Sequence, residues 1–430
     1  MLRERLAALH HWLTVLSAGT TALKVSNECD VIKVKGIYNV GNSCYLSVIL
    51  QLLATSSTFV NYISTFSTTA TSTSNNTYFI NELCNCLRAI RNGRDYVDVY
   101  NPSKILTYMK KANSSIMVGT NSQHDAHEVF SILLTMLSTM DKGDQSYSLV
   151  PKESMMHTRR IENPLIGMIS NTLTCQSCSR RRPIKHESFT SIILPIPITN
   201  KAVDLYDCFE AFTQDEELQD PIECLACSLT KTKTALVNRI KAYDSLNMGE
   251  LKDKELRKLA RVKDYHVSGE TDEYVHDFDQ NFIKITDGDN HKVSVEYTLI
   301  SKTRTYFRKR AMLSRLPPML NIMLQRKGIN PLTGMEIKRN QYISFPMTLD
   351  VAPFCSLIKT NTKYTLQSVI VHEGTADNGH YSIFTRSNEN SSDWKWISDT
   401  KVSSVTNISA VFNHIKAYML LYSLSYQGCS

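Results

Sequence analysis

The chain has 430 residues, of which 42% are hydrophobic and 21% are charged, and this composition excludes collagen-like, low-complexity and wholly disordered proteins. The length predicts two or three compact units, or one large domain with an insertion. Lys and Arg exceed Asp and Glu by a net charge of +7, a mild excess that by itself identifies no partner.

The 11 cysteines are an odd number spread over a long chain, which favours a reducing compartment over a disulfide framework. The N-terminal segment 1–33 is the only candidate for targeting or membrane attachment. Its apolar stretch, residues 6–25, is interrupted by His10 and His11 and ends near Lys24, so it is weaker than a typical spanning helix. A membrane anchor, a signal peptide and an amphipathic surface helix remain open for this segment.

Two segments have the apolar spacing of helices with one buried face. The first starts at Cys44, and the second starts near His124. Between them, residues 64–77 are almost entirely Ser, Thr and Asn, and we expect an exposed loop there.

The chain changes character at about Ile166, from which shorter, β-rich runs predominate. A charged stretch, residues 240–291, interrupts these runs, and its composition indicates an insertion or a mobile loop. Helices followed by a β-rich half predict an α+β protein with a β-rich projection.

Cys44 lies between a turn that contains Gly and Asn and the start of an apolar helix. Backbone N–H groups at a helix N-terminus favour a thiolate, so we expect the pKa of this thiol to be lowered. Gly36 and Gly41 allow a substrate carbonyl to approach the backbone, and the side-chain amides of Asn39 and Asn42 can donate to an oxyanion. Taken alone, a cysteine such as Cys44 is more often a small buried hydrophobic residue, and the further segments below favour a nucleophile.

Two further segments supply partners for a nucleophilic thiol. His372 and His380 flank a turn that contains Gly and Asn, an arrangement in which two strands can place an imidazole at the edge of a cleft. Downstream, either Ser398 or Asp399 can accept a hydrogen bond from the ring of His380 and fix its tautomer. The order of Cys, His and a polar group is typical of thiol hydrolases.

Two C-x-x-C pairs, Cys175 with Cys178 and Cys224 with Cys227, predict a closed four-cysteine zinc site that stabilises the fold. Their separation suits two β-hairpin tips that meet at the end of a subdomain. A redox-active pair and a vestigial site without metal are the alternatives. Apart from the close pair Cys84 and Cys86, the remaining cysteines have no further ligand spacing, and core packing explains most of them: Cys29, Cys84, Cys86, Cys208, Cys355 and Cys429.

Several basic runs, such as residues 180–182 and 308–310, are not accompanied by an aromatic recognition motif. They fit solvated surfaces, and we expect no binding to nucleic acid.

Together, these segments resemble the ubiquitin-specific proteases, papain-like cysteine peptidases that cleave after the C-terminal glycine of ubiquitin. GIYNVGNSCY resembles the cysteine box of the family, SQHDAHEVF its Gln-Asp box, and HEGTADNGHYSIF followed by WKWISDTKV its histidine box. CQSC and CLAC fall between these boxes, as the zinc pairs of the family's fingers do. The resemblance runs in order from about Val34 to Ser425.

The resemblance implies a catalytic domain over residues 34–430, with a helical thumb at about 34–145, a fingers insertion at about 166–300 and a palm formed by the rest. It implies that Cys44 is the nucleophile, that His380 is the general base and that Asn39 lines the oxyanion hole. Gln123 and Asp125 match the positions that hold the tail of ubiquitin. The implied partners are ubiquitin and ubiquitinated proteins, and the implied cofactor is structural zinc.

Ser398 occupies a position that is Asn or Asp in most of the family. A serine there is similar to the member found in the mitochondrial outer membrane, which uses a Cys-His-Ser triad. This likeness implies a location on that membrane facing the cytosol, and ubiquitin chains joined through the sixth residue of ubiquitin as substrates. Asp399 remains an alternative orienting group. A ubiquitin-binding module with weak catalysis, and a peptidase for another ubiquitin-like modifier, remain alternative functions.

Overall fold

The computed structural model describes most of the chain, which divides into two compact units. The described residues are 34–69, 75–91, 99–112, 124–143, 162–199, 201–263, 282–283, 298–299, 302–329, 334, 336–357, 361–375, 379–387 and 391–425. The first unit combines residues from Met1–Gly167, Ser188–Phe212 and Arg315–Ser430, and the second combines Met168–Glu187 with Thr213–Ser314. The N-terminal segment 1–33 lies outside the described residues.

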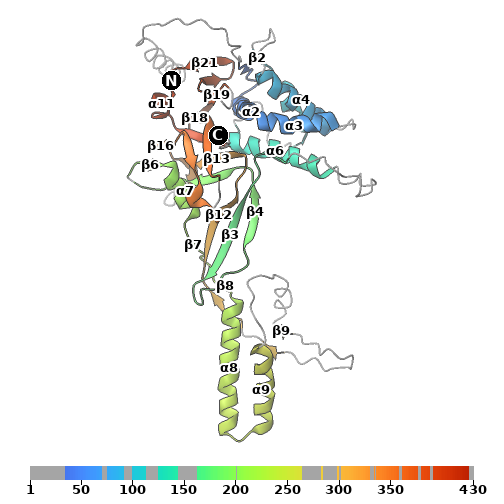
Figure 1. The fold of residues 1–430 in the computed structure, drawn as a ribbon, viewed down its shortest axis with the longest axis vertical. Helices are drawn as coiled ribbons and strands as arrows, with labels where there is room; N and C mark the ends of the chain where they lie inside the picture. Colours follow the sequence, from blue (N-terminus) through green and yellow to red (C-terminus); the bar gives the residue numbers. More distant parts are fainter. Residues whose placement is uncertain are drawn as a thin grey trace. The chain divides into compact units, whose positions relative to one another are not determined.

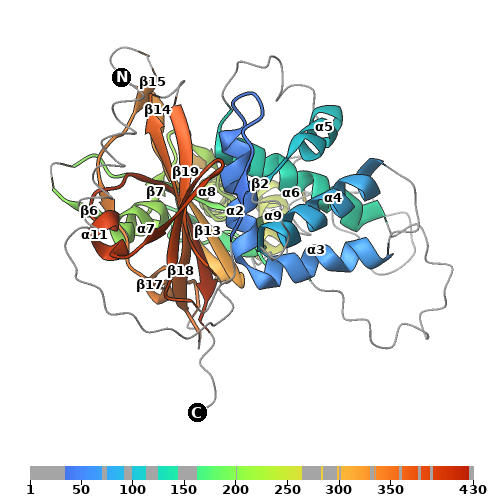
Figure 2. The same cartoon turned by 90° about the horizontal axis from the view of Figure 1, so that it is seen from above.

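Helices form one half of the first unit. They are α2 (Cys44–Thr55), α3 (Ser57–Thr69), α4 (Asn75–Arg91), α5 (Ser103–Ala112) and α6 (Ala126–Gly143), accompanied by the parallel strands β1 (Gly36–Ile37) and β2 (Val99–Tyr100). Helix α2 is buried along its whole length, because it packs against strands on one side and against α3, α4 and α6 on the other (Figure 2). The helix expected from Cys44 is confirmed, and the one expected near His124 begins at Ala126.

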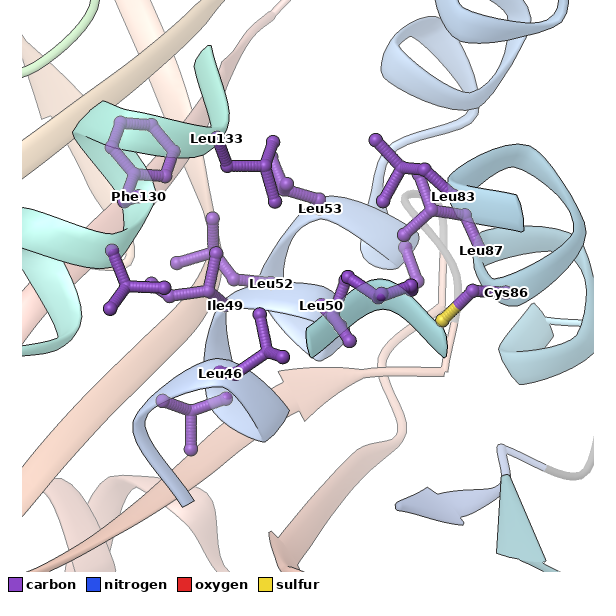
Figure 3. Packing of buried hydrophobic residues seen from close by; sticks show 14 of the residues in the cluster. Leu46, Ile49, Leu50, Leu52, Leu53, Leu83, Cys86, Leu87, Phe130 and Leu133 are labelled. Atoms are coloured by element: carbon purple, nitrogen blue, oxygen red, sulfur yellow. The ribbon is translucent and has the colours of Figure 1, made fainter. Parts of the chain in front are cut away.

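The core around α2 is built from aliphatic side chains contributed by several helices. Figure 3 shows Leu46, Ile49 and Leu53 of α2 among side chains of α4 and α6. Burying a Leu or Ile side chain contributes about 1.5–3 kcal/mol. This packing fixes the first turn of α2, and with it Cys44, in a rigid framework.

An eight-stranded sheet forms the other half of the first unit. Its order is β21 (Lys401–Val405), β20 (Trp394–Ser398), β19 (Gly379–Arg386), β18 (Lys363–Gly374), β22 (Ala417–Leu424), β13 (Met319–Gln325) and β5 (Ile192–Pro195), with β17 (Thr348–Asp350) also pairing with β18. All neighbours pair antiparallel except β13 and β5, which are parallel. Strands β18 and β19 form a hairpin that pairs Glu373 with His380, so the predicted strand pair at these histidines is confirmed.

Smaller elements complete the first unit. They are β6 (Val203–Asp204), α7 (Leu205–Thr213), β14 (Lys327–Ile329), β15 (Glu336–Lys338), β16 (Ile343–Ser344), the short 3₁₀ helix η5 (Ala352–Phe354) and α11 (Ile408–Phe412).

The second unit contains a four-stranded sheet and a helical hairpin (Figure 1). The sheet has the order β4 (Lys185–Phe189), β3 (Gly167–Cys175), β12 (Phe307–Arg315) and β7 (Glu216–Glu217). Strand β8 (Ile222–Glu223) pairs with β11 (Arg304–Thr305), and β9 (Phe282–Ile283) pairs with β10 (Thr298–Leu299). Helices α8 (Leu225–Ser245) and α9 (Gly249–Lys263) pack side by side around Leu229, Leu236, Leu259 and Val262.

The expected loop at residues 64–77 is wrong over most of its length. Residues up to Thr69 continue α3, α4 begins at Asn75, and residues 70–74 lie outside the described part of the chain. Ser and Thr have low helix propensity, but α3 also buries Phe59, Tyr62 and Ile63, and this packing outweighs propensity.

The charged stretch 240–291 is likewise not a loop over residues 240–263, which belong largely to α8 and α9. Their charged side chains lie largely on the outside of a hairpin whose interior is formed by Leu229, Leu236, Leu259 and Val262. The general prediction of an α+β protein, with helices first and a β-rich part after them, is confirmed.

Candidate active site and four-cysteine cluster

Cys44 is the first residue of α2 and follows a tight turn. Gly41 and Asn42 both have left-handed backbone conformations, with φ of 57° and 64°. Gly and Asn are residues that adopt this conformation at low cost, which is why the chain can reverse immediately before the helix. The hydroxyl of Ser43 accepts a hydrogen bond from the backbone N–H of Val40 over 2.9 Å and closes the turn.

Asn39 is held at both ends of its side-chain amide. Its oxygen accepts a hydrogen bond from the backbone N–H of Ser43 over 2.8 Å, and its nitrogen donates to Oδ2 of Asp399 over 2.9 Å. An amide nitrogen carries two hydrogens, and the hydrogen bond to Asp399 uses one of them. These two hydrogen bonds hold the Asn39 side chain between Ser43, the residue before Cys44, and Asp399.

The thiol of Cys44 is buried, and burial raises its pKa above the ordinary value. The negative charge of Asp399 raises the pKa further, while hydrogen bonds from the backbone N–H groups of Tyr381 and Tyr45 lower it. The expectation of a lowered pKa is wrong: the backbone N–H groups at the start of α2 act in the expected direction, but desolvation outweighs them. The raised pKa favours the neutral thiol, so a base is needed to ionise it.

His380 lies near the start of β19, and Tyr381, whose backbone N–H faces the thiol, is the next residue. Nε2 of His380 is 2.8 Å from the hydroxyl oxygen of Ser398 and 3.9 Å from Oδ2 of Asp399. Ser398 is the last residue of β20 and is buried, whereas Asp399 follows in a left-handed conformation with φ of 52°. Of these two residues, only the serine is within hydrogen-bond distance of the imidazole.

The segment before Cys44 is hydrogen-bonded to the turn that contains Ser398 and Asp399. The backbone N–H of Ile37 donates to the carbonyl oxygen of Asp399 over 2.9 Å. A Cβ atom on Gly36 would lie 2.6 Å from the carbonyl oxygen of Thr400, so only glycine fits there without a shift of backbone. Gly36 is therefore needed for a close backbone contact within the protein. The sequence analysis expected it to let a substrate carbonyl approach the backbone.

Lys338 is a residue of the site that the sequence analysis missed. Its ammonium group is 3.0 Å from Nδ1 of His372 and donates to the backbone carbonyls of His372 and Gly374 over 3.2 and 2.9 Å. Burial lowers the pKa of Lys338 to about 8, and burial together with this lysine lowers the pKa of His372 to about 4. No local motif marks Lys338, because β15 reaches the histidine hairpin only in the folded protein.

Neutral His372 stacks on the ring of Tyr381, with ring centroids 4.3 Å apart. Its Nε2 would be 2.3 Å from a Cβ atom on Gly379, so the glycine before His380 is required by this packing. His372 therefore supports the hairpin that carries His380.

Asp125 is placed at the N-terminus of α6, where its Oδ1 accepts hydrogen bonds from the backbone N–H of His127 over 2.8 Å and of Glu128 over 3.4 Å. The hydroxyl of Tyr418 also donates to Oδ1, over 2.5 Å. Oδ2 lies 3.8 Å from the ammonium group of Lys327. Gln123, the other expected ubiquitin-binding residue, lies outside the described residues.

The four cysteines of the second unit form a cluster in which all sulfur atoms lie within 4.8 Å of one another. The sulfur of Cys175 is 3.8 Å from that of Cys227, and the sulfur of Cys178 is 3.7 Å from that of Cys224. Tetrahedral zinc with Zn–S bonds of about 2.3 Å requires sulfur separations of roughly 3.8 Å. The donor set and its spacing therefore fit a zinc ion.

Only one of the two pairs lies at a β-hairpin tip. Cys175 ends β3, and a bridge between Thr174 and Arg181 closes the turn around this pair. Cys224 instead precedes α8, and Cys227 lies in its first turn. The expectation of two hairpin tips is thus wrong for the second pair, where a helix N-terminus takes the place of the hairpin.

Of the remaining cysteines, Cys84, Cys86 and Cys208 are buried and fit the expected core packing, while Cys355 is half-buried. Cys29 and Cys429 fall outside the described residues.

Comparison with known proteins identifies the family. The model of the ubiquitin carboxyl-terminal hydrolase family matches residues 35–422. Ubiquitin carboxyl-terminal hydrolase 30 of Xenopus tropicalis is 23% identical, over 90% of this chain and 80% of that protein, and its Danio rerio counterpart is 23% identical over 90% and 85%. The probable ubiquitin carboxyl-terminal hydrolase 8 of Schizosaccharomyces pombe is 23% identical over 92% of this chain and 66% of its own length.

Solved structures with a similar fold include deubiquitinase (DUB) modules. Ubp8 in the SAGA Ubp8/Sgf11/Sus1/Sgf73 DUB module bound to ubiquitin aldehyde has a TM-score of 0.62 at 19% identity, over 98% of this chain and 75% of that chain. A structure of this module with monoubiquitin gives a TM-score of 0.60, also at 19% identity, over 96% and 74%. The chain belongs to the ubiquitin carboxyl-terminal hydrolase family, has the fold of the ubiquitin-specific proteases, and is a cysteine-type deubiquitinase.

Proposed function

We propose that Cys44 attacks the carbonyl carbon of the C-terminal glycine of ubiquitin, with His380 as general base and Ser398 as the group that orients it. The observation that carries this assignment is the meeting of three distant segments. The thiol of Cys44 lies beside the backbone N–H of Tyr381, and the adjacent His380 contacts the Ser398 hydroxyl over 2.8 Å.

In this mechanism the bond between Nε2 of His380 and Ser398 leaves Nδ1 to accept the thiol proton. Because the pKa of Cys44 is raised by burial, proton transfer accompanies the attack instead of preceding it. The second amide hydrogen of Asn39 stabilises the oxyanion, and the imidazolium protonates the leaving amine. Water, activated by the same imidazole, then hydrolyses the Cys44 thioester and releases ubiquitin.

A neutral serine orients the ring but provides no negative charge to stabilise imidazolium. Asp399 supplies a carboxylate at 3.9 Å from Nε2, while its hydrogen bond goes to Asn39. We therefore assign Asp399 to holding the oxyanion donor, and Ser398 to orienting the base.

The test is a reaction with ubiquitin that carries a thiol-reactive electrophile at its C-terminus. We expect a mass increase of one ubiquitin for the wild type and none for Cys44→Ala. Cys355→Ala, which removes a half-buried thiol from the same unit, is the matched control and should react like the wild type. Reaction of Cys44→Ala would place the nucleophile elsewhere, and failure of folded wild type to react would favour a ubiquitin-binding module or another modifier as substrate.

For ubiquitin recognition, we propose that Asp125 and Gln123 hold the C-terminal tail. Oδ2 of Asp125 supports this role, because its only near partner among the described residues is Lys327 at 3.8 Å and the side chain is 17% exposed. Asp125→Asn keeps an oxygen for the helix cap but removes the charge. It should raise KM for ubiquitin substrates more than it lowers kcat, whereas an equal loss of activity toward a short peptide and toward a ubiquitin substrate would indicate a structural effect.

We also propose that the four-cysteine cluster binds structural zinc, as its sulfur spacing supports. Such an ion would tie β3 and the start of α8 together and would have no open position for catalysis. We propose further that the second unit corresponds to the fingers, and that the helices and the eight-stranded sheet of the first unit correspond to the thumb and palm.

We propose the mitochondrial outer membrane as the location, with the N-terminal segment 1–33 as its attachment. This proposal rests on the resemblance of the Cys-His-Ser triad and of the flanking motifs to those of the family member found in the mitochondrial outer membrane. Within the described part of the chain, no single helix is long and apolar enough to cross a bilayer, and α2 with α3 meet the criterion only as a pair bent by 98°. Carbonate extraction of mitochondria containing full-length protein tests the proposal, and recovery of all the protein in the cytosolic fraction would contradict it.

A further inference from the structure

The ammonium group of Lys338 binds one end of strand β18. It lies 3.0 Å from Nδ1 of His372, and it donates to the carbonyl oxygens of His372 and Gly374 over 3.2 and 2.9 Å. An ammonium group has three hydrogens and no lone pair, so Nδ1 of His372 is the acceptor in the first contact. Each of the three hydrogens therefore has an acceptor within the last three residues of β18.

These contacts take the place of a neighbouring strand. Pairing of β18 with β22 ends one residue before His372, while pairing with β19 continues on the other side. The carbonyl oxygen of Glu373 faces Gly379 in β19. Carbonyl groups of successive residues in a strand point to opposite edges, so those of His372 and Gly374 point away from β19. Lys338 supplies the donor that a further strand would otherwise supply there.

The end of β18 is also the part of the sheet that lies opposite the proposed general base. In the antiparallel pairing with β19, Glu373 lies opposite His380. The residues on either side of Glu373, both bound by the ammonium group, lie opposite Gly379 and Tyr381. The backbone N–H of Tyr381 donates to the thiol of Cys44. Because directly opposite residues are only about 4.5–5.5 Å apart, a shift of β18 moves both the imidazole and this thiol contact.

We propose that Lys338 is a positioning residue for the general base, because its ammonium group fixes the strand opposite His380 and so holds the imidazole where it can take the proton of Cys44. This inference rests on the proposed role of His380 as base. Lys338 acts through the backbone of β18 and the ring of His372, and not on the reacting atoms.

The strength of this hold depends on the protonation of Lys338. Burial lowers its pKa to about 8, and the carboxylate of Glu373 acts in the opposite direction. Three neighbouring cations add to the lowering of this pKa: Arg326, Lys416 and Lys327. His372, which is in direct contact, has a pKa of about 4 and stays neutral in this range. A neutral amine has two hydrogens for three acceptors, so one contact with β18 is lost as the pH rises through about 8.

The test is the pH dependence of kcat for a ubiquitin–fluorophore conjugate, measured for wild type, Lys338→Arg and Lys338→Met. For wild type, we expect kcat to fall about three- to tenfold between about pH 7 and about pH 9.5, as loss of one hydrogen bond implies. Lys338→Arg stays charged over this range and should show no such decline. Lys338→Met keeps the length of the side chain without its hydrogens, and should lower kcat about tenfold at neutral pH with little change in KM.

Two further variants separate this role from general effects. Lys363→Met is the matched control, because Lys363 is an exposed residue at the other end of β18. It should keep the kcat and the pH profile of the wild type. His380→Ala tests the underlying assignment and should abolish turnover at every pH.

Two outcomes would overturn the role of Lys338 while the assignment of the base stands. The first is an inactive His380→Ala together with wild-type kcat in folded Lys338→Met. The second is an identical pH profile for wild type and Lys338→Arg, a comparison that does not depend on whether Lys338→Met folds. Wild-type turnover in His380→Ala would instead overturn the proposed base, and the role of Lys338 with it.

Discussion

The side-chain amide of Asn39 donates a hydrogen bond to Oδ2 of Asp399, 360 residues further along the chain, over 2.9 Å. The same carboxylate lies 3.9 Å from Nε2 of His380, which has the Ser398 hydroxyl at 2.8 Å. Adjacent residues at the end of β20 therefore serve different partners. Ser398 contacts the imidazole, and Asp399 contacts the candidate oxyanion donor.

Removing the Ser398 hydroxyl is expected to lower kcat with little change in KM. Ser398→Ala loses one hydrogen bond to the imidazole, and we expect a decrease in kcat of about tenfold. Steady-state cleavage of a ubiquitin–fluorophore conjugate measures it, with Ser403→Ala on the exposed face of β21 as the control. If Ser398→Ala behaves like this control, Ser398 does not orient His380.

Asn39 and Asp399 are expected to act as one unit. Asn39→Ala and Asp399→Ala should each lower kcat, and the double variant should be barely worse than the more damaged single variant. The coupling free energy expected from the shared hydrogen bond is about 1–2 kcal/mol. A double-mutant cycle on kcat/KM measures it. Additive losses would show that Asp399 acts on another group, such as His380.

The stability of the first unit is expected to decrease as the pH falls from about 6.5 to about 4. His372 has a pKa of about 4 when folded, so it stays neutral there while the unfolded chain takes up a proton. Because the unfolded state binds more protons, the free energy of unfolding falls with pH across this window, by up to about 3 kcal/mol from this residue. Below the folded pKa the contribution of His372 becomes constant.

Urea unfolding followed by the emission of the buried Trp394 and Trp396 measures this dependence. His372→Gln should flatten the pH dependence, and His186→Gln, which changes an exposed histidine of the second unit, should not. An unchanged slope in His372→Gln would show that His372 is not held neutral by burial and by Lys338.

Zinc removal is expected to loosen the second unit. Purified protein should contain stoichiometric zinc, and Cys224→Ser should lose it together with the protection of α8 from hydrogen exchange, because ligand removal costs folding free energy. Elemental analysis and hydrogen exchange measure the two effects. Cys355→Ser, a cysteine of the first unit, should keep its zinc. Absence of zinc from freshly purified wild type would refute the zinc site.

Gly36→Ala is expected to lower both stability and activity. The added Cβ would lie 2.6 Å from the carbonyl oxygen of Thr400, so the turn that carries Ser398 and Asp399 must shift. Overpacking of this kind costs about 1–3 kcal/mol. Thermal unfolding and kcat measure the effect. Gly249→Ala is the control, because nothing lies within 4 Å of a Cβ atom there. Equal melting temperatures for the two variants would contradict the close contact.

Local sequence identified the residues whose chemistry is evident from their neighbours. The turn before Cys44, the helix that follows it, the strand pair at His372 and His380 and the two cysteine pairs all have short-range patterns, because apolar period, glycine and ligand spacing act within a few residues. The order of these segments along the chain matched that of the family, and this resemblance predicted the fold and the deubiquitinase activity.

Tertiary structure decided what depends on contacts between distant segments. Burial of Phe59 and Tyr62 made a helix of a stretch rich in Ser and Thr, and desolvation raised the pKa of Cys44 where the helix N-terminus alone would have lowered it. The different contacts of Ser398 and Asp399 depend on the left-handed turn at Asp399, which places one side chain on the imidazole and the other on Asn39. Sequence supplies the candidate groups, whereas distance and desolvation, which set their hydrogen bonds and protonation, exist only once the chain has folded.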